Sequence, residues 1–247
     1  FNSASLHRHI SQSYKFDHFT HGFVEILAAE QTLSDSSWFQ GTADAVRKHM
    51  THFLNHRFDY ILILSGDQLY NMDFRQVLNE HIANDAELTV ATIPVNREAA
   101  SGFGIMQIDE DHRILEFVEK PKEESVIDSL KLPDTTRGDL NIKATDDQFL
   151  ASMGIYIFNR EVLVELLDSD DADFGKHIIP KAIKTCRSFS HVYQGYWEDV
   201  GTIKTFFDAN LDAASELPKF NFFDMSAPIF TRPRFLPASK INSAAID

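Results

Sequence analysis

Apolar runs alternate with helical stripes along the first half of this sequence. Residues 61–64 and residues 88–95 are apolar runs with little polar alternation, which is typical of strands buried on both faces of a parallel sheet. Between these runs, Val77, Leu78 and Ile82 recur at helical spacing. The order helix, strand, helix, strand, helix, strand predicts an α/β fold whose sheet is mainly parallel and covered by helices.

The pattern changes after residue 100. Residues 103–109 and 113–118 are two apolar segments on either side of a polar turn, which predicts a hairpin and therefore a mixed sheet. Residues 149–158 predict a further strand, and residues 23–27 are strand-like near the start of the chain. The polar stretch 122–148 has weak periodicity, so we interpret it as an insertion.

The composition shifts again after Leu217. Prolines punctuate the last thirty residues and prevent a continuous helix; they are Pro218, Pro228, Pro233 and Pro237. We therefore predict one domain over residues 1–217 and a linker over residues 218–247.

Composition and charge exclude several classes of function. The net charge of −14 argues against a nucleic-acid-binding protein and against an anionic membrane surface, because both need basic patches. No apolar run approaches the ~20 residues of a membrane span. Cys186 is the single cysteine, so a disulfide framework is impossible and a reducing cytoplasm is the natural setting. The sequence begins at Phe1 with residues typical of the middle of a domain, so we expect a chain truncated at its N-terminus.

Two carboxylates follow predicted strands. Asp67 comes directly after the run 61–64 and Ser65-Gly66, and Asp199 lies between a predicted strand and a helix capped by Thr202. Ligands of open α/β sheets bind just past the carboxyl ends of strands, and Mg²⁺ commonly takes one or two carboxylates together with substrate phosphates. Each aspartate taken alone is more simply explained as a residue that opens a loop or precedes a helix.

A lysine lies at the end of the predicted hairpin, in Glu119-Lys120-Pro121. The proline predicts an extended backbone at Lys120, which would help to fix the direction of its side chain. A lysine there supplies a compact positive charge for a phosphate. The alternative is a surface lysine in an ordinary salt bridge.

Taken together, these segments resemble the glucose-1-phosphate adenylyltransferase (ADP-glucose pyrophosphorylase) family. They occur in family order across nearly the whole chain, and the set is specific although no single member is decisive. The matching segments are Phe1-Asn-Ser-Ala-Ser-Leu6, Trp38-Phe-Gln-Gly-Thr-Ala-Asp-Ala-Val46, Ile61-Leu-Ile-Leu-Ser-Gly-Asp67, Phe103-Gly104, Glu116-Phe-Val-Glu-Lys-Pro121, Leu150-Ala-Ser-Met-Gly-Ile-Tyr156, Asp173-Phe-Gly-Lys176, Gly195-Tyr-Trp-Glu-Asp-Val-Gly-Thr202 and Pro228-Ile-Phe-Thr-Arg-Pro-Arg234.

The resemblance implies an enzyme that makes ADP-glucose and pyrophosphate from ATP and glucose 1-phosphate, for glycogen or starch biosynthesis. It implies a Rossmann-like, GT-A-like mixed sheet with helices on both faces, and a homotetramer when the protein is full length. The roles it implies are Mg²⁺ ligands (Asp67, Asp199), sugar-phosphate contacts (Glu119, Lys120, Gly104, Ser152, and Phe39 where some members carry Tyr) and a nucleotide turn (Gln40, Gly41, Thr42, Ala43). Asp67 and Lys120 would be the catalytic pair.

Two family features have no counterpart in these 247 residues. One is the glycine-rich loop of the form G-G-x-G-x-R-L, and the other is the C-terminal left-handed β-helix that takes part in oligomer contacts and regulation. We therefore expect the chain alone to lack turnover. Three alternatives stay open: a sugar-phosphate nucleotidyltransferase of other specificity, a non-catalytic regulatory subunit, and an inactive fragment. Retention of Asp67, Lys120 and Asp199 favours catalysis.

Overall fold

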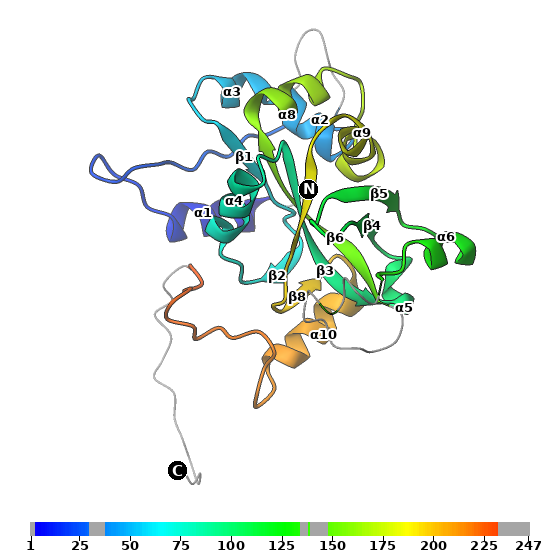
Figure 1. The fold of residues 1–247 in the computed structure, drawn as a ribbon. Helices are drawn as coiled ribbons and strands as arrows, with labels where there is room; N and C mark the ends of the chain where they lie inside the picture. Colours follow the sequence, from blue (N-terminus) through cyan, green and yellow to red (C-terminus); the bar gives the residue numbers. More distant parts are fainter. Residues whose placement is uncertain (1–2, 30–37, 134–137, 139–147, 232–247) are drawn as a thin grey trace, which may run out of the picture. The chain divides into compact units, whose positions relative to one another are not determined.

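A computed structural model describes residues 3–29, 38–133, 138 and 148–231 (Figure 1). The chain forms two compact units, Phe1–Ala28 with Asn221–Asp247, and Ala29–Phe220. The first unit contains α1 (Ala4–Ser13), and its residues 23–27 have no regular structure, so the strand predicted there is wrong. The predicted domain boundary at residue 217 stays a prediction.

The second unit contains the sheet strands and the other helices. The strands are β1 (Tyr60–Ile63), β2 (Gln68–Tyr70), β3 (Leu88–Asn96), β4 (Gly104–Ile108), β5 (Ile114–Glu119), β6 (Gln148–Asn159), β7 (Ser188–Val192) and β8 (Trp197–Asp199). The helices are α2 (Thr42–Lys48), α3 (Met50–Leu54), α4 (Phe74–Ala83), α5 (Arg97–Ala100), α6 (Glu124–Ser129), α8 (Arg160–Leu167), the π-helix η1 (Phe174–Ile178), α9 (Ile179–Thr185) and α10 (Ile203–Ala213). Much of the predicted insertion at 122–148 lies outside the described residues.

The main sheet is mixed, as predicted, with β6 in its middle (Figure 1). β6 pairs antiparallel with β3 along one edge and with β4 and then β1 along the other, and β7 pairs parallel with β3. Consequently β1, β3, β4 and β7 run in one direction, while β5 and β6 run against them. Most strands of the sheet share one direction. Most neighbouring pairs are nevertheless antiparallel, mainly because β6 lies between β3 on one side and β1 and β4 on the other.

Helices pack on both faces of this sheet. On one face, apolar side chains of α2, α8, η1 and α9 pack with Val90, Tyr156 and Phe158 in the largest core cluster. On the other face, Ala151 packs with residues of α5 and α6, and Met153 packs near β2 and β8. Four-residue β1 is less buried than its apolar run predicts, since Leu62 is 36% exposed. An apolar run identifies a strand but does not show how many of its faces are covered.

Two local features follow the ends of β1 and β8: a small two-stranded sheet and a helix cap. β2 and β8 form a separate two-stranded sheet in which Gln68 lies opposite Asp199. Thr202 caps α10 directly after β8, and its hydroxyl accepts the N–H of Thr205, as the sequence predicts. No helix among the described residues is long and apolar enough to cross a membrane.

Candidate active site

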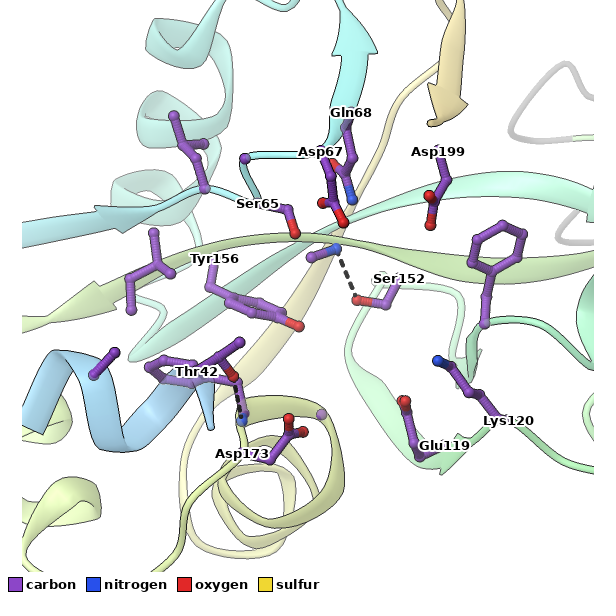
Figure 2. Close-up of a pocket in the computed structure, with 18 of the residues that line it drawn as sticks. Thr42, Ser65, Asp67, Gln68, Glu119, Lys120, Ser152, Tyr156, Asp173 and Asp199 are labelled. Atoms are coloured by element: carbon purple, nitrogen blue, oxygen red, sulfur yellow. Dashed lines mark hydrogen bonds between the residues drawn. The ribbon is translucent and has the colours of Figure 1, made fainter. Parts of the chain in front are cut away.

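A cavity of about 660 Å³ opens in the second unit where β1, β5 and β8 end (Figure 2). Ligand sites of α/β proteins commonly lie at such carboxyl ends of strands. The cavity brings together side chains that lie up to 157 positions apart (199 − 42) in the sequence. Six of the predicted site residues line it: Thr42, Asp67, Glu119, Lys120, Ser152 and Asp199.

Asp67 and Asp199 lie together on one side of the cavity (Figure 2). The antiparallel pairing of β2 with β8 brings them close, and the N–H of Val200 donates to the backbone oxygen of Asp67 at 3.0 Å. A Cβ added at Gly201 would lie 2.8 Å from Asp199 Oδ1 and 3.4 Å from Asp67 Oδ2. Both carboxylates therefore border the space that this glycine leaves open.

Glu119 and Lys120 lie on a different wall of the cavity, at the end of β5 (Figure 2). Lys120 has a φ of 47°, so the extended backbone predicted from the following proline is wrong. Its N–H donates to the backbone oxygen of Phe103 at 3.1 Å, and this contact holds the turn. A non-glycine residue in the left-handed region costs about 1 kcal/mol or more, and such residues cluster at functional sites.

Glycines leave room for the carboxylate of Glu119. A Cβ at Gly104 would lie 2.8 Å from Glu119 Oε2, and one at Gly175 would lie 3.0 Å from the same oxygen. Gly104 is not itself among the lining residues, so the structure places it behind Glu119. A side chain at Gly104 would displace Glu119 or the neighbouring ring of Phe117.

Burial is the main cause of the raised pKa values of Glu119 and Tyr156. Burial raises the pKa of the Glu119 carboxyl, the nearby Lys120 and Lys176 lower it, and Asp173 raises it. Burial also raises the pKa of Tyr156 to about 12, despite an opposing hydrogen bond with Ser152. Tyr156 therefore keeps its phenolic proton near neutral pH and can act there as a hydrogen-bond donor.

The sequence did not predict a role for several lining residues. Asp173 and Tyr156 face the cavity beside Glu119 (Figure 2), and Phe103 packs edge-on against Trp197 with ring centroids 5.2 Å apart. Asp173 lies in a segment that carried the family resemblance, so a signal was present for it. Tyr156 also ends such a segment, although nothing else in the sequence distinguishes it from the other positions of a buried strand.

Only part of the predicted nucleotide turn lines this cavity. Thr42 does, whereas Gln40, Gly41 and Ala43 do not. Gly41 is the N-cap position of α2, and the Thr42 hydroxyl accepts the N–H of Phe174 at 3.2 Å.

Phe39 also lies outside the lining. Its ring packs edge-on against His49, with centroids 5.5 Å apart, and the ammonium of Lys48 lies 5.9 Å from its centroid. In the structure, this side chain therefore packs against α2 and the turn that follows it.

Comparison with known proteins identifies the family. A family model described as "Nucleotidyl transferase" matches residues 1–216. This chain belongs to the nucleotidyl transferase family. Every residue that lines the cavity falls within the matched range, and the mixed, helix-covered sheet of the chain agrees with the predicted fold class.

One relative of this chain is the glucose-1-phosphate adenylyltransferase small subunit, chloroplastic/amyloplastic, of Triticum aestivum. The two are 44% identical over 254 residues, which cover 100% of this chain and 54% of the relative. The chain thus spans about half the length of that relative.

Proposed function

We propose that this chain is part of an enzyme that makes ADP-glucose and pyrophosphate from ATP and glucose 1-phosphate. The observation that carries the proposal is one cavity with two aspartates on one wall and Glu119-Lys120 on another. The Lys120 ammonium can bind a phosphate, and the Glu119 carboxylate can accept hydrogen bonds from sugar hydroxyls. The carboxylates of Asp67 and Asp199, on the other wall, can hold a metal ion. The similarity to the wheat adenylyltransferase subunit supports this substrate pair over other nucleotides and sugars.

Asp67 and Asp199 are the residues that would hold Mg²⁺. Their chemistry fits this ion, since Mg²⁺ prefers oxygen ligands and often takes only one or two carboxylates. No group of three or more His, Cys, Asp or Glu suited to a metal occurs among the described residues, so a site made entirely of protein ligands is not the arrangement proposed. When bound, Mg²⁺ would neutralise phosphate charge.

The remaining residues would bind and orient the substrates. Lys120 would hold the phosphate of glucose 1-phosphate, Glu119 would accept hydrogen bonds from sugar hydroxyls, and Ser152 would contact the sugar. A phosphate oxygen of the sugar then attacks the α-phosphorus of ATP. The bond from that phosphorus to the bridging oxygen breaks, and pyrophosphate leaves. No covalent enzyme intermediate is needed, so catalysis consists of positioning and charge stabilisation.

Other predicted roles remain part of the proposal. Gly104 would let Glu119 approach the sugar, and the turn with Gln40, Gly41, Thr42 and Ala43 would approach the nucleotide. A substrate contact by Phe39 stays a prediction from the resemblance. A homotetramer and regulation by an allosteric effector are proposed from the resemblance. The predicted cytoplasmic location stays a prediction, because the name of the wheat relative places that protein in the chloroplast or amyloplast.

A substrate panel with the full-length protein tests the proposed function. Pyrophosphate release is measured with ATP, UTP, GTP, CTP and dTTP, each combined with glucose 1-phosphate, mannose 1-phosphate or N-acetylglucosamine 1-phosphate. We expect ATP with glucose 1-phosphate to give the highest kcat/KM. Preference for another pair would assign a different specificity, and no release with any pair would favour the non-catalytic subunit.

The half-buried carboxyl of Glu119 predicts an unusual pH dependence of stability. In the folded state the pKa of Glu119 is raised, so as pH rises above the ordinary glutamate pKa the unfolded chain loses the Glu119 proton before the folded protein does. The free energy of unfolding therefore falls with rising pH until the pKa of Glu119 in the folded state is passed. Glu119→Gln should therefore raise the melting temperature at pH 7.5, and the gain should vanish near pH 4.

The control for this prediction is Glu116→Gln, an exposed glutamate on the same strand. It should change the melting temperature equally little at both pH values. Glu119→Gln should also weaken glucose 1-phosphate binding, so that stability rises while function falls. A Glu119→Gln protein that is no more stable at pH 7.5 than the wild type would contradict the raised pKa of Glu119 as the cause.

A further inference from the structure

Asp44 is a buried carboxylate outside the cavity. It is 6% exposed, and no other Asp or Glu among the described residues is buried. Its Oδ2 accepts the N–H of Gln40 at 2.8 Å, and its Oδ1 accepts a hydrogen bond from Arg47 Nη2 at 2.9 Å. Asp44 thus ties the predicted nucleotide turn to the helix that follows it.

Arg47 extends this tie to a second segment. While Nη2 contacts Asp44, its Nη1 donates to the backbone oxygen of Asp171 at 2.7 Å. Two residues later in the second segment, Asp173 faces the cavity beside Glu119. The Arg47 guanidinium therefore links α2 to the segment that leads to Asp173, on the cavity wall that also carries Glu119. We call this pair of residues the Asp44–Arg47 clip.

Backbone contacts beside the clip join the same two segments. The N–H groups of Ala43 and Asp44 both donate to the backbone oxygen of Ala172, at 2.9 and 3.1 Å. A Cβ at Gly41 would lie 2.3 Å from that oxygen, so only glycine permits this close approach. These backbone contacts and the clip therefore join the same two segments.

The charges of the clip depend on each other. Burial raises the pKa of Asp44, but the Gln40 N–H and the cations Arg47 and Lys48 outweigh it, so the pKa is lowered overall. Lys48 Nζ lies 3.5 Å from Asp44 Oδ2, further than the Arg47 contact. Without Arg47, the buried carboxylate would lose its closest cation, and the Asp171 oxygen would lose a donor.

We infer that Asp44 and Arg47 are positioning residues that fix the nucleotide turn and Asp173 relative to each other, and so act on both substrate sites at once. The inference rests on the proposed function. Neither side chain lines the cavity, so neither would touch a substrate. Replacing a residue that contacts only one of these segments would change the binding of one substrate. The clip joins the turn predicted for the nucleotide to the segment that carries Asp173 beside Glu119, so replacing it should change the binding of both.

Kinetics of Arg47→Met in the full-length protein test the inference. A charge-assisted hydrogen bond corresponds to about 10- to 100-fold in an equilibrium constant. We expect KM for both substrates of the pair selected by the panel to rise by at least about 10-fold. Arg47→Lys keeps the charge near Asp44 but cannot span both acceptors, so it should raise both KM values less. Adding Asp44→Asn to Arg47→Met should produce less than the product of the separate effects.

Arg97→Met is the matched control. Arg97 likewise contacts two acceptors, the carboxylates of Glu124 and Asp128, at 2.6 and 2.7 Å, and it does not line the cavity. Its loss should leave both KM values within about 2-fold, as expected for exposed ion pairs.

Hydrogen exchange gives a readout that does not depend on turnover. In Arg47→Met and Arg47→Lys, the amides of Gln40, Asp44 and Phe174 should exchange faster, while the amide of Val90 in β3 should not change. Unchanged exchange at either segment would refute the clip even if the proposed function failed. Faster exchange at both segments, with neither KM or only one KM raised, would show a purely structural role and overturn the inference. If Arg47→Met does not fold, Arg47→Lys decides by the same criteria.

Discussion

Asp67→Asn in the full-length protein should lower kcat by at least about 100-fold, the scale for loss of one preorganised electrostatic group. The reason is the loss of one of the two carboxylates that border the space beside Gly201. Folding should change little, because the contact that Asp67 makes with the N–H of Val200 uses its backbone oxygen. Steady-state kinetics over a range of Mg²⁺ concentrations measure the effect, together with a thermal melt.

Asp73→Asn provides the control for the aspartate substitution. Asp73 caps α4 by accepting the N–H of Arg75 at 3.0 Å, and asparagine caps helices equally well. This variant should keep both its melting temperature and its kcat. Near-normal turnover of Asp67→Asn at every Mg²⁺ concentration would refute the assignment of Asp67 as a metal ligand.

The location of Asp67 could be predicted because its cause is local. An apolar run that stops at Ser65-Gly66 marks a strand and its end, and the next residue must lie past that end. The cap at Thr202 and the hairpin of β4 with β5 are local in the same sense, and the structure has both. Each of these features depends on a few neighbouring residues.

Features that depend on distant partners could not be predicted. Tyr60 of β1 pairs with Asn159 of β6, 99 positions later (159 − 60), and no local pattern specifies this register. β6 lies in the middle of the sheet and changes partners near Gly154, whose φ is 67°. The predicted parallel order assumed that neighbouring strands come from successive helix-strand units, and β6 breaks that assumption.

Some side chains gain their importance only through the fold. Asp44 and Arg47 are spaced by three residues on one helix, which in a sequence is typical of an exposed ion pair of little consequence. The approach of the Asp171 backbone turns this pair into a link between two segments. The backbone of Lys120 is a similar case, because the Phe103 contact favours a left-handed conformation that the following proline does not predict.

Lys120→Gln should raise KM for glucose 1-phosphate by about 10- to 100-fold, the scale for a charge-assisted hydrogen bond, and change KM for ATP far less. Glutamine is similar in length, so the exposed side chain can be replaced without a packing defect. The substitution also removes a positive charge that lowers the Glu119 pKa, so the rise in KM should grow as pH falls.

Initial-rate kinetics with each substrate varied in turn measure this split. Lys122→Gln is the matched control: Lys122 is an exposed lysine two positions further on that does not line the cavity, and its loss should leave both KM values unchanged. A Lys120 that serves only as a structural charge would, when replaced, alter both KM values alike or alter the melting temperature instead. Selective loss of sugar-phosphate binding at constant stability is therefore the result that assigns Lys120 to the phosphate.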